Sequence, residues 1–254
     1  MSVKRILSAQ NEYIKKLSKL KTSKGRKEFG LFITEGERSC FEAVKCGFDL
    51  ECVVMTEDFF DSHQNLFSDF EIVVTSEKAF MGLCDTKTPQ GVLAVAKIPK
   101  TNKISKGKYM YLDSIRDPGN AGTIIRSAHA FGFSGVIFSK ECVDVFSPKV
   151  IRSSMGSVFY IDILTDADIN TLENARKDGF FITASALYSE SKDISQMTKK
   201  ENMIIVAGNE AEGVSEEILS FADEIVHIKM PGGAESLNVA VASSVLMYEV
   251  AKNE

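Results

Sequence analysis

The sequence predicts an α/β fold in which a mainly parallel sheet forms a C-terminal domain and a smaller α/β domain precedes it. Two observations predict this arrangement. Short apolar runs alternate with helix-like stretches along the chain, a pattern typical of strands connected by helices. A lysine-rich segment without acidic residues interrupts the alternation, and its composition is that of a linker. We therefore expect domains at 1–97 and 109–254, joined by a basic linker at 98–108.

In the first domain, apolar residues at helical spacing predict a basic amphipathic helix over Ser8–Leu20. Gly47 follows another helical stretch and is a typical C-terminal stop. The expected strands are Leu31–Ile33, Cys52–Met55, Ile72–Val74 and Gly91–Ala96. The expected helices are Glu37–Lys45, Glu57–Phe67 and Glu77–Leu83.

In the second domain, the apolar runs are short and nearly uninterrupted, as in strands buried on both faces of a parallel sheet. Ser147 and Pro148 fit the N-cap and first position of a helix. The expected strands are Tyr109–Leu112, Val136–Phe138, Phe180–Thr183, Ile204–Ala207 and Ile225–Ile228. The expected helices are Thr123–Phe131, Pro148–Ser154, Ile169–Lys177, Ser215–Phe221 and Leu237–Ala251.

The charge of the chain is distributed unevenly. The formal net charge is -5, yet residues 1–27 carry +8 and the remainder carries −13. A basic end of this kind is typical of a protein that binds the phosphate backbone of RNA, although a solvated, lysine-rich helix face has the same composition. The candidate RNA-binding residues are Lys15, Lys16, Lys19, Lys21, Lys24, Arg26 and Lys27.

Several protein classes are disfavoured. No apolar run approaches the ~18 residues that span a bilayer, and the N-terminal end lacks the apolar region of a secretory signal, so we expect no membrane association. The five cysteines form no C-x-x-C pair. They indicate reduced thiols, a cytoplasmic location and no metal site. The phosphate-binding, dinucleotide-binding and serine-hydrolase fingerprints are missing from the sequence, which disfavours those enzymes.

Three polar, glycine-bearing loops each follow an expected strand of the second domain: Asp113–Arg126, Gly208–Ser215 and Lys229–Ala242. Each loop taken alone is compatible with ordinary turn chemistry. The carboxyl ends of parallel strands lie at one edge of a sheet, however, and ligands bind there. We therefore expect the three loops to converge and build one pocket.

The three loops resemble the three motifs of the SpoU (TrmH-type) family of RNA ribose 2′-O-methyltransferases, within the SPOUT superfamily. The matching residues of the first loop are Asn120, Gly122 and Arg126, and those of the second are Gly208, Asn209, Glu210, Glu212 and Gly213. Those of the third are Pro231, Ser236, Leu237, Asn238, Val239 and Ala242. Two N-terminal stretches, Phe32–Arg38 and Thr88–Val92, are similar to the substrate-binding domain of that family.

The resemblance implies a trefoil knot in the second domain, S-adenosylmethionine as the cofactor and a homodimer. It makes Gly208, Ile228 and Leu237 the first expected cofactor contacts, with Asn209, Gly213 and Met230 beside them. Glycine permits close backbone approach, and the two aliphatic side chains suit an adenine ring or a methionyl chain.

The resemblance also implies the catalytic set. Arg126 corresponds to the catalytic arginine of the family, and we interpret it as an electrostatic clamp on an oxyanion, since a guanidinium is rarely deprotonated. Asn120 and Asn238 are expected to orient the hydroxyl group and the loops. Glu210 is expected to hold either Arg126 or a loop amide. Ser236 either binds the ribose or caps a helix.

Two further features have simpler explanations. His129 lies one helical turn beyond Arg126, but a packed helix residue is the favoured interpretation over a proton relay. Core packing is likewise favoured over stacking on RNA bases for the phenylalanines at 59, 60, 67 and 70.

The resulting hypothesis is a cytoplasmic RNA 2′-O-ribose methyltransferase that acts as a homodimer, with ribosomal RNA (rRNA) favoured over tRNA as the substrate. The alternatives are a tRNA 2′-O-methyltransferase, a methyltransferase that modifies a base, and a non-catalytic RNA-binding assembly factor with the same fold.

Overall fold

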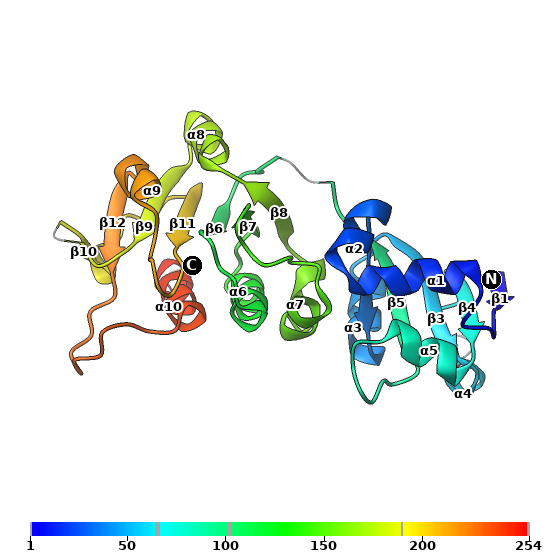
Figure 1. Ribbon diagram of the computed structural model, residues 1–254. Helices are drawn as coiled ribbons and strands as arrows, with labels where there is room; N and C mark the ends of the chain where they lie inside the picture. Colours follow the sequence, from blue (N-terminus) through cyan, green and yellow to red (C-terminus); the bar gives the residue numbers. More distant parts are fainter. Residues whose placement is uncertain (1, 64–66, 101–102, 189, 253–254) are drawn as a thin grey trace. The chain divides into compact units, whose positions relative to one another are not determined.

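The computed structural model describes residues 2–63, 67–100, 103–188 and 190–252. The chain forms two compact units (Figure 1). Unit 1 comprises Met1–Pro99 together with Phe146–Phe159, and unit 2 comprises Lys100–Val145 and Tyr160–Glu254. The expected scheme placed 146–159 in the second domain, whereas these residues pack within unit 1. None of the described helices is long and apolar enough to cross a membrane.

Unit 1 contains a five-stranded sheet of order β1-β4-β3-β5-β2. β1, β4 and β3 run parallel, and β5 is antiparallel to both of its neighbours. The strands are β1 (Ser2–Arg5), β2 (Leu31–Glu35), β3 (Leu50–Thr56), β4 (Glu71–Thr75) and β5 (Val92–Lys97). The helices are α1 (Glu12–Ser18), η1 (Lys19–Lys21), α2 (Ser23–Phe29), α3 (Glu37–Lys45), α4 (Glu57–Ser62), α5 (Glu77–Leu83), α7 (Pro148–Ser153) and η2 (Ser157–Phe159).

Unit 2 contains a seven-stranded sheet of order β10-β12-β9-β11-β6-β7-β8, and every neighbouring pair is parallel. The strands are β6 (Lys108–Leu112), β7 (Gly135–Ser139), β8 (Asp162–Ala167), β9 (Phe181–Ser185), β10 (Lys192–Asp193), β11 (Met203–Ala207) and β12 (Glu224–His227). The helices are α6 (Pro118–Ala130), α8 (Ile169–Lys177), η3 (Ile194–Gln196), α9 (Glu216–Phe221) and α10 (Val239–Ala251). The predicted α/β fold with a mainly parallel sheet is confirmed.

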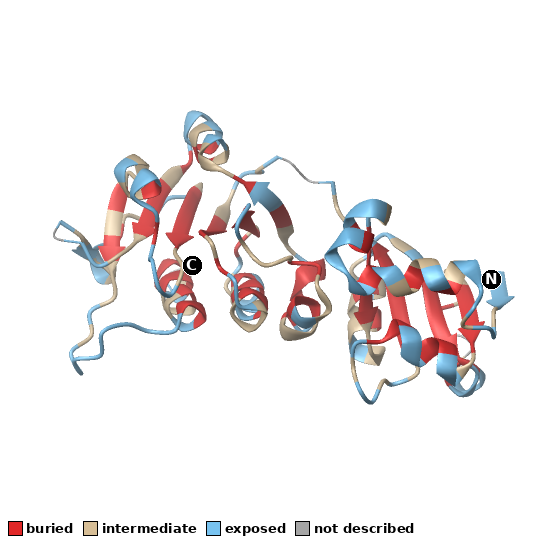
Figure 2. Cartoon of the chain, in the orientation of Figure 1, coloured by how far each residue is buried: buried red, intermediate tan, exposed pale blue. Residues whose placement is uncertain are grey.

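The core of unit 2 forms because its central strands are apolar on both faces, as Figure 2 shows by their uniform burial. Tyr109, Tyr111 and Ile204 pack against Leu172 of α8 and Ile218 of α9. Helices α6 and α10 cover the opposite face (Figure 1). The two are joined by a hydrogen bond between the Ser127 and Ser244 hydroxyl groups, 2.7 Å long.

Several elements differ from the prediction. The expected helix Ser8–Leu20 is a shorter helix, α1, followed by the 3₁₀ turn η1. The edge strands β1, β8 and β10, and helix α2, were not expected, because their sequences are polar or lack an apolar period. Residues 64–66 of the expected helix Glu57–Phe67 lie outside the described residues; α4 ends at Ser62. The phenylalanines at 59, 60 and 67 are buried in the core of unit 1 and Phe70 packs against it, as favoured.

Candidate active site and RNA-binding surface

A cavity of about 630 Å³ opens at the carboxyl ends of the central strands of unit 2. The sheet order places β9 between β12 and β11, so the loops that follow these three strands meet at one place. The lining residues come from Ser185–Leu187 after β9, from Ala207–Glu210 and Gly213 after β11, from His227–Met230 after β12, and from Ala234–Val239, Ala242 and Leu246.

The loop after β11 is a tight hairpin that leaves no room for a side chain at Gly208. Asn209 and Gly213 exchange two backbone hydrogen bonds, with N–O distances of 3.0 and 2.8 Å. A Cβ at Gly208 would lie 2.0 Å from the carbonyl carbon of Gly213 and 2.2 Å from the nitrogen of Val214. Glycine is therefore required here for close packing of the hairpin against the strand end.

Two side chains tie this hairpin to the loop after β6. The side-chain amide of Asn209 donates a hydrogen bond to the carbonyl oxygen of Ser114, 2.8 Å away. Asp113, which is buried, accepts a hydrogen bond of 2.9 Å from the backbone N–H of Ser215. Asp113 was not among the predicted site residues. Its position directly after a buried strand, at the start of the first loop, is a signal that could have identified it.

The sulfur of Cys142 forms hydrogen bonds with the backbone at the start of the same loop. The backbone N–H of Ile115 donates to its sulfur at 3.3 Å, and the sulfur contacts the carbonyl oxygen of Leu112 at 3.1 Å. Burial raises the pKa of the Cys142 thiol, so the thiol stays protonated and able to donate to that carbonyl. This geometry suits a packing role and not a nucleophile.

A chain of side-chain hydrogen bonds joins all three loops. The amide of Asn238 donates to Oδ1 of Asn120 across 3.0 Å, and the amide of Asn120 donates to Oε1 of Glu210. Asn120 lies in the first turn of α6, where Asp117 is the N-cap and accepts from the Asn120 backbone N–H at 2.8 Å. The expected convergence of the three loops is thus observed, and Glu210 holds a side-chain amide, not Arg126.

Helix α10 begins two residues later than the expected Leu237, because Asn238 is its N-cap. Oδ1 of Asn238 accepts hydrogen bonds from the N–H groups of Ala240 and Val241, 3.0 and 3.3 Å away. The capping alternative for Ser236 is therefore wrong. Ser236 is exposed and lines the cavity, which leaves its hydroxyl group accessible to a ligand.

All six predicted cofactor residues line the cavity: Gly208, Asn209, Gly213, Ile228, Met230 and Leu237. Of the predicted catalytic residues, Glu210, Ser236 and Asn238 also line it, and Asn120 contacts two of them. Sequence reasoning missed Ser185–Leu187 and His227, which line the cavity too. The loop after β9 has no glycine-rich signature, and only the sheet order reveals that it lies between the two others.

Arg126 lies elsewhere on α6. Six residues separate it from Asn120, which places the two side chains about 120° apart around the helix. Arg126 is exposed, and within the described part of the chain no hydrogen bond or ion pair involves its guanidinium. His129, on the next turn, stacks on Tyr160 with ring centroids 4.7 Å apart. His129 is exposed but packs its ring on Tyr160, which fits the favoured interpretation of a packed helix residue only in part.

The basic residues of the N-terminal end lie on α1, η1 and α2. Lys15, Lys24 and Lys27 are exposed. Lys16 and Lys19 are directed toward the ring of Phe29, with ammonium-to-centroid distances of 5.2 and 5.9 Å. These contacts leave the charges available to solvent.

Arg26 must be removed from the RNA-binding candidates. Its side chain is 4% exposed, and Nη1 donates to the carbonyl oxygen of Leu20 at 2.7 Å. It therefore fixes η1 against α2 and cannot reach a phosphate. Lys21 is exposed, but its ammonium donates to the carbonyl oxygen of Cys84 at 2.9 Å.

Comparison with known proteins identifies the family. Residues 107–248 match the SpoU rRNA methylase family, and residues 11–94 match the MRM3-like substrate binding domain. The chain is 32% identical over 249 residues to the 23S rRNA (guanosine(2553)-2'-O)-methyltransferase RlmP of Bacillus subtilis, an alignment that covers 98% of this chain and 99% of the relative. It is 25% identical to human mitochondrial rRNA methyltransferase 3, over 88% of this chain and 68% of the relative.

The fold leads to the same conclusion. The crystal structure of AdoMet-bound rRNA methyltransferase from Sinorhizobium meliloti superposes with a TM-score of 0.87 and 28% identity, covering 99% of this chain and 98% of that one. The family match spans more than half of the chain and includes all three loops that meet at the cavity. The chain belongs to the SpoU rRNA methylase family.

Proposed function

We propose that this chain methylates the 2′-hydroxyl group of a ribose in large-subunit rRNA, using S-adenosylmethionine. The observation that carries the proposal is the junction of Glu210, Asn120 and Asn238, which brings the three loops together beside the cavity. The relative from Bacillus subtilis, aligned over almost its full length, is named for 2′-O-methylation of 23S rRNA, which supports rRNA over tRNA.

The cavity fits the cofactor by its chemistry. Gly208, Asn209 and Gly213 offer backbone groups from a tightly packed hairpin, while Ile228, Met230 and Leu237 offer apolar side chains. A mixed lining of this kind suits an adenosyl group, whose flat ring is apolar and whose edges form hydrogen bonds. When bound, S-adenosylmethionine supplies an electrophilic methyl group attached to a positively charged sulfur.

The chain itself must then position and activate the ribose hydroxyl group. A hydroxyl is a weak nucleophile until its proton leaves or its developing negative charge is stabilised. We assign this stabilisation to Arg126, whose fork of donors suits an alkoxide or a neighbouring phosphate. Ser236, with its exposed hydroxyl group at the cavity, is assigned to hydrogen bonding with the ribose. The role assigned to Asn120, Glu210 and Asn238 is to hold the three loops together through their side-chain hydrogen bonds.

We infer that the enzyme is a homodimer built on α6 and α10. Helix α10 has one charged residue, Glu249, and a helix that is apolar on all sides is normally buried. In the single chain Val241 and Tyr248 are 49% and 56% exposed. They line an apolar groove of about 350 Å³ with Thr123 and Phe131. A second copy covering this groove would also enclose the exposed face of α6, which bears Arg126.

The remaining parts of the proposal rest on the family and on general chemistry. The resemblance to the family supports a trefoil knot in the domain at 109–254, with 1–97 as the RNA-binding domain and 98–108 as a linker. The exposed lysines of α1, η1 and α2 support RNA binding by the first of these domains. The five free thiols support a cytoplasmic location.

The experiment that tests the proposal is a map of ribose methylation in total RNA from a deletion strain. We expect one 2′-O-methyl group to disappear from large-subunit rRNA and to return when the wild-type gene is restored. The same RNA preparation also contains tRNA, and its methylated bases are measured alongside its methylated riboses. A methyl group lost from tRNA, or from a base, would contradict the proposed substrate.

A further inference from the structure

We propose that α7 carries part of the RNA-binding surface of unit 1, although in the sequence it lies inside the methyltransferase motif region. The site is a cationic cluster of Lys21, Lys87, Lys149 and Arg152, which we call the α7 cluster. Its ligand is the phosphate backbone of the RNA substrate, so the inference rests on the proposed function and deepens it.

The segment 146–159 is anchored firmly in unit 1. Phe146 and Phe159 pack on Phe32 of β2, with ring centroids 4.9 and 6.3 Å apart, and Phe159 contacts Phe48 at 5.0 Å. Val150 and Ile151 of α7 are buried. With its apolar side packed in this way, α7 presents its polar side as part of the surface of unit 1.

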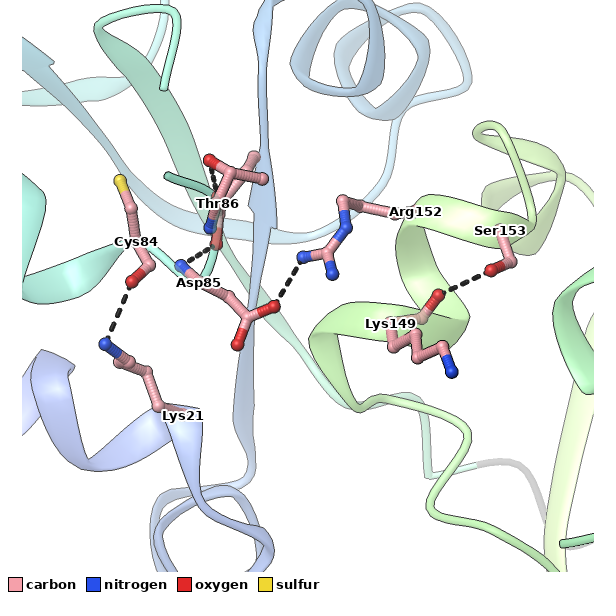
Figure 3. A network of polar contacts seen from close by, with 8 residues as sticks. Lys21, Cys84, Asp85, Thr86, Lys149, Arg152 and Ser153 are labelled. Atoms are coloured by element: carbon pink, nitrogen blue, oxygen red, sulfur yellow. Dashed lines mark hydrogen bonds and ion pairs between the residues drawn. The ribbon is translucent and has the colours of Figure 1, made fainter. Parts of the chain in front are cut away.

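That polar side carries two cations. Lys149 and Arg152 lie three residues apart on α7, which places them on neighbouring positions of one helix face. Nη1 of Arg152 forms an ion pair with Oδ2 of Asp85 across 2.7 Å, as Figure 3 shows. The ion pair brings α7 to the loop 84–91. Lys149 is exposed, and no ion pair involves it among the described residues.

The start of the loop 84–91 is hydrogen-bonded to Glu35 of β2 and to Lys21 of η1. The carboxylate of Glu35 accepts hydrogen bonds from the N–H groups of Asp85 and Thr86, at 2.6 and 3.2 Å, and from the Thr86 hydroxyl at 2.8 Å. On the other side, the ammonium of Lys21 donates to the carbonyl oxygen of Cys84 (Figure 3). Lys87 directly follows these hydrogen-bonded residues, and it is exposed.

The charges of the α7 cluster are not fully neutralised. Asp85 is paired with Arg152, and the carboxylate of Glu35 is occupied by three donors of the loop. Lys21 contacts only carbonyl oxygens through its ammonium, and within the described residues no ion pair reaches Lys87. Three chain segments that are distant in sequence thus place cations at or beside one hydrogen-bonded loop, an arrangement suited to a polyanion.

Lys21 also connects this cluster to the basic helices α1 and α2, since it belongs to η1 between them. The two groups of cations therefore lie on adjoining elements of one unit. Both η1 and α7 pack against β2, so an RNA strand bound along α1 and α2 can extend to α7. This continuity favours RNA over an acidic protein as the ligand, because phosphates are repeated along a strand.

The test uses the full-length double variant Lys87→Ala/Lys149→Ala and a large-subunit rRNA transcript. The matched control is Lys45→Ala/Lys177→Ala, since both of these lysines are exposed, lie in the last turns of α3 and α8, and belong neither to the α7 cluster nor to the basic helices α1 and α2. We expect the α7 variant to bind RNA at least tenfold more weakly. The slope of log affinity against log salt should also fall by about 1 to 2, in line with two lost phosphate contacts. The control should match wild type.

Affinity for S-adenosylmethionine, measured by calorimetry, should be unchanged in both variants, and Lys87→Arg/Lys149→Arg should restore RNA binding. The wild type could bind and methylate RNA while the α7 variant binds RNA with the same affinity. That result would refute RNA binding by the α7 cluster and leave the proposed function intact. If the wild type binds neither RNA nor S-adenosylmethionine, the proposed function fails, and this inference fails with it.

Discussion

The side-chain amide of Asn238 donates a 3.0 Å hydrogen bond to Oδ1 of Asn120, although 118 residues separate them. Asn238 simultaneously caps α10 through its own Oδ1. One side chain thus fixes the start of a helix and couples the third loop to the first. We therefore expect the position of the cavity wall to depend on Asn238.

Replacing this residue by alanine tests that dependence. Asn238→Ala should destabilise the protein by about 1 kcal/mol, the usual effect of removing an N-cap, and should also weaken binding of S-adenosylmethionine. Asn11→Ala is the matched control, because Asn11 caps α1 through a 2.8 Å bond from the Tyr13 N–H. It should lower the melting temperature similarly and leave calorimetric cofactor affinity unchanged. Equal cofactor affinity in both variants would show that the cap alone matters.

Gly208 tests whether the hairpin shapes the cavity. A Cβ at this position would overlap the backbone of Gly213 and Val214, so Gly208→Ala should displace the hairpin and reduce cofactor affinity by about tenfold or more, or 1.4 kcal/mol. Gly82→Ala is the control, since a Cβ there meets nothing within 4 Å. In helix α5 it should be neutral or stabilising. A Gly208→Ala enzyme with wild-type affinity would contradict the assignment of the cofactor to this cavity.

Arg126 should matter for the chemical step and not for cofactor binding, because it lies outside the cavity lining of its own chain. We expect Arg126→Ala to lower kcat by about 100-fold or more, the usual loss for one charge-stabilising donor. Calorimetric affinity for S-adenosylmethionine should stay the same. Arg126→Lys should not restore the rate, since it lacks the planar fork. Full activity of Arg126→Ala would exclude the proposed role.

The apolar face of α10 predicts which substitution breaks the proposed dimer. Val241→Glu would place a charge in the centre of the inferred interface, so sedimentation should report a monomer with little methyltransferase activity. Val3→Glu makes the same change at another exposed valine, in unit 1, and should leave the oligomeric state unaltered. A wild-type protein that sediments as a monomer would refute the dimer directly.

The fold class could be predicted from the sequence, because buried parallel strands and glycine-bearing loops leave clear local signals. The six expected cofactor residues came from the resemblance to the family, and all six line the cavity. Contributions that depend on the order of strands in space could not be predicted. Ser185 and Leu187 line the cavity only because β9 lies between β12 and β11. The anchoring of α7 in unit 1 depends similarly on Phe32 and Phe159, which the sequence does not connect.

The role of an individual side chain was harder to predict where the same residue type can serve two roles. Ser236 and Asn238 are both good N-cap residues, and the hydrogen bonds of α10 show that only Asn238 takes the role. Arg26 belongs to a run of exposed cations and yet is buried. Its guanidinium donates to the carbonyl oxygen of Leu20, where the chain turns from η1 to α2.

The most direct test of the proposed function is methyl transfer by the purified protein to unmodified large-subunit rRNA, with isotopically labelled S-adenosylmethionine and nucleoside mass spectrometry of the product. We predict one labelled methyl group on the 2′-oxygen of a single ribose, absent with the Arg126→Ala enzyme. Label on a base, or no transfer by a protein that binds both RNA and cofactor, would contradict it.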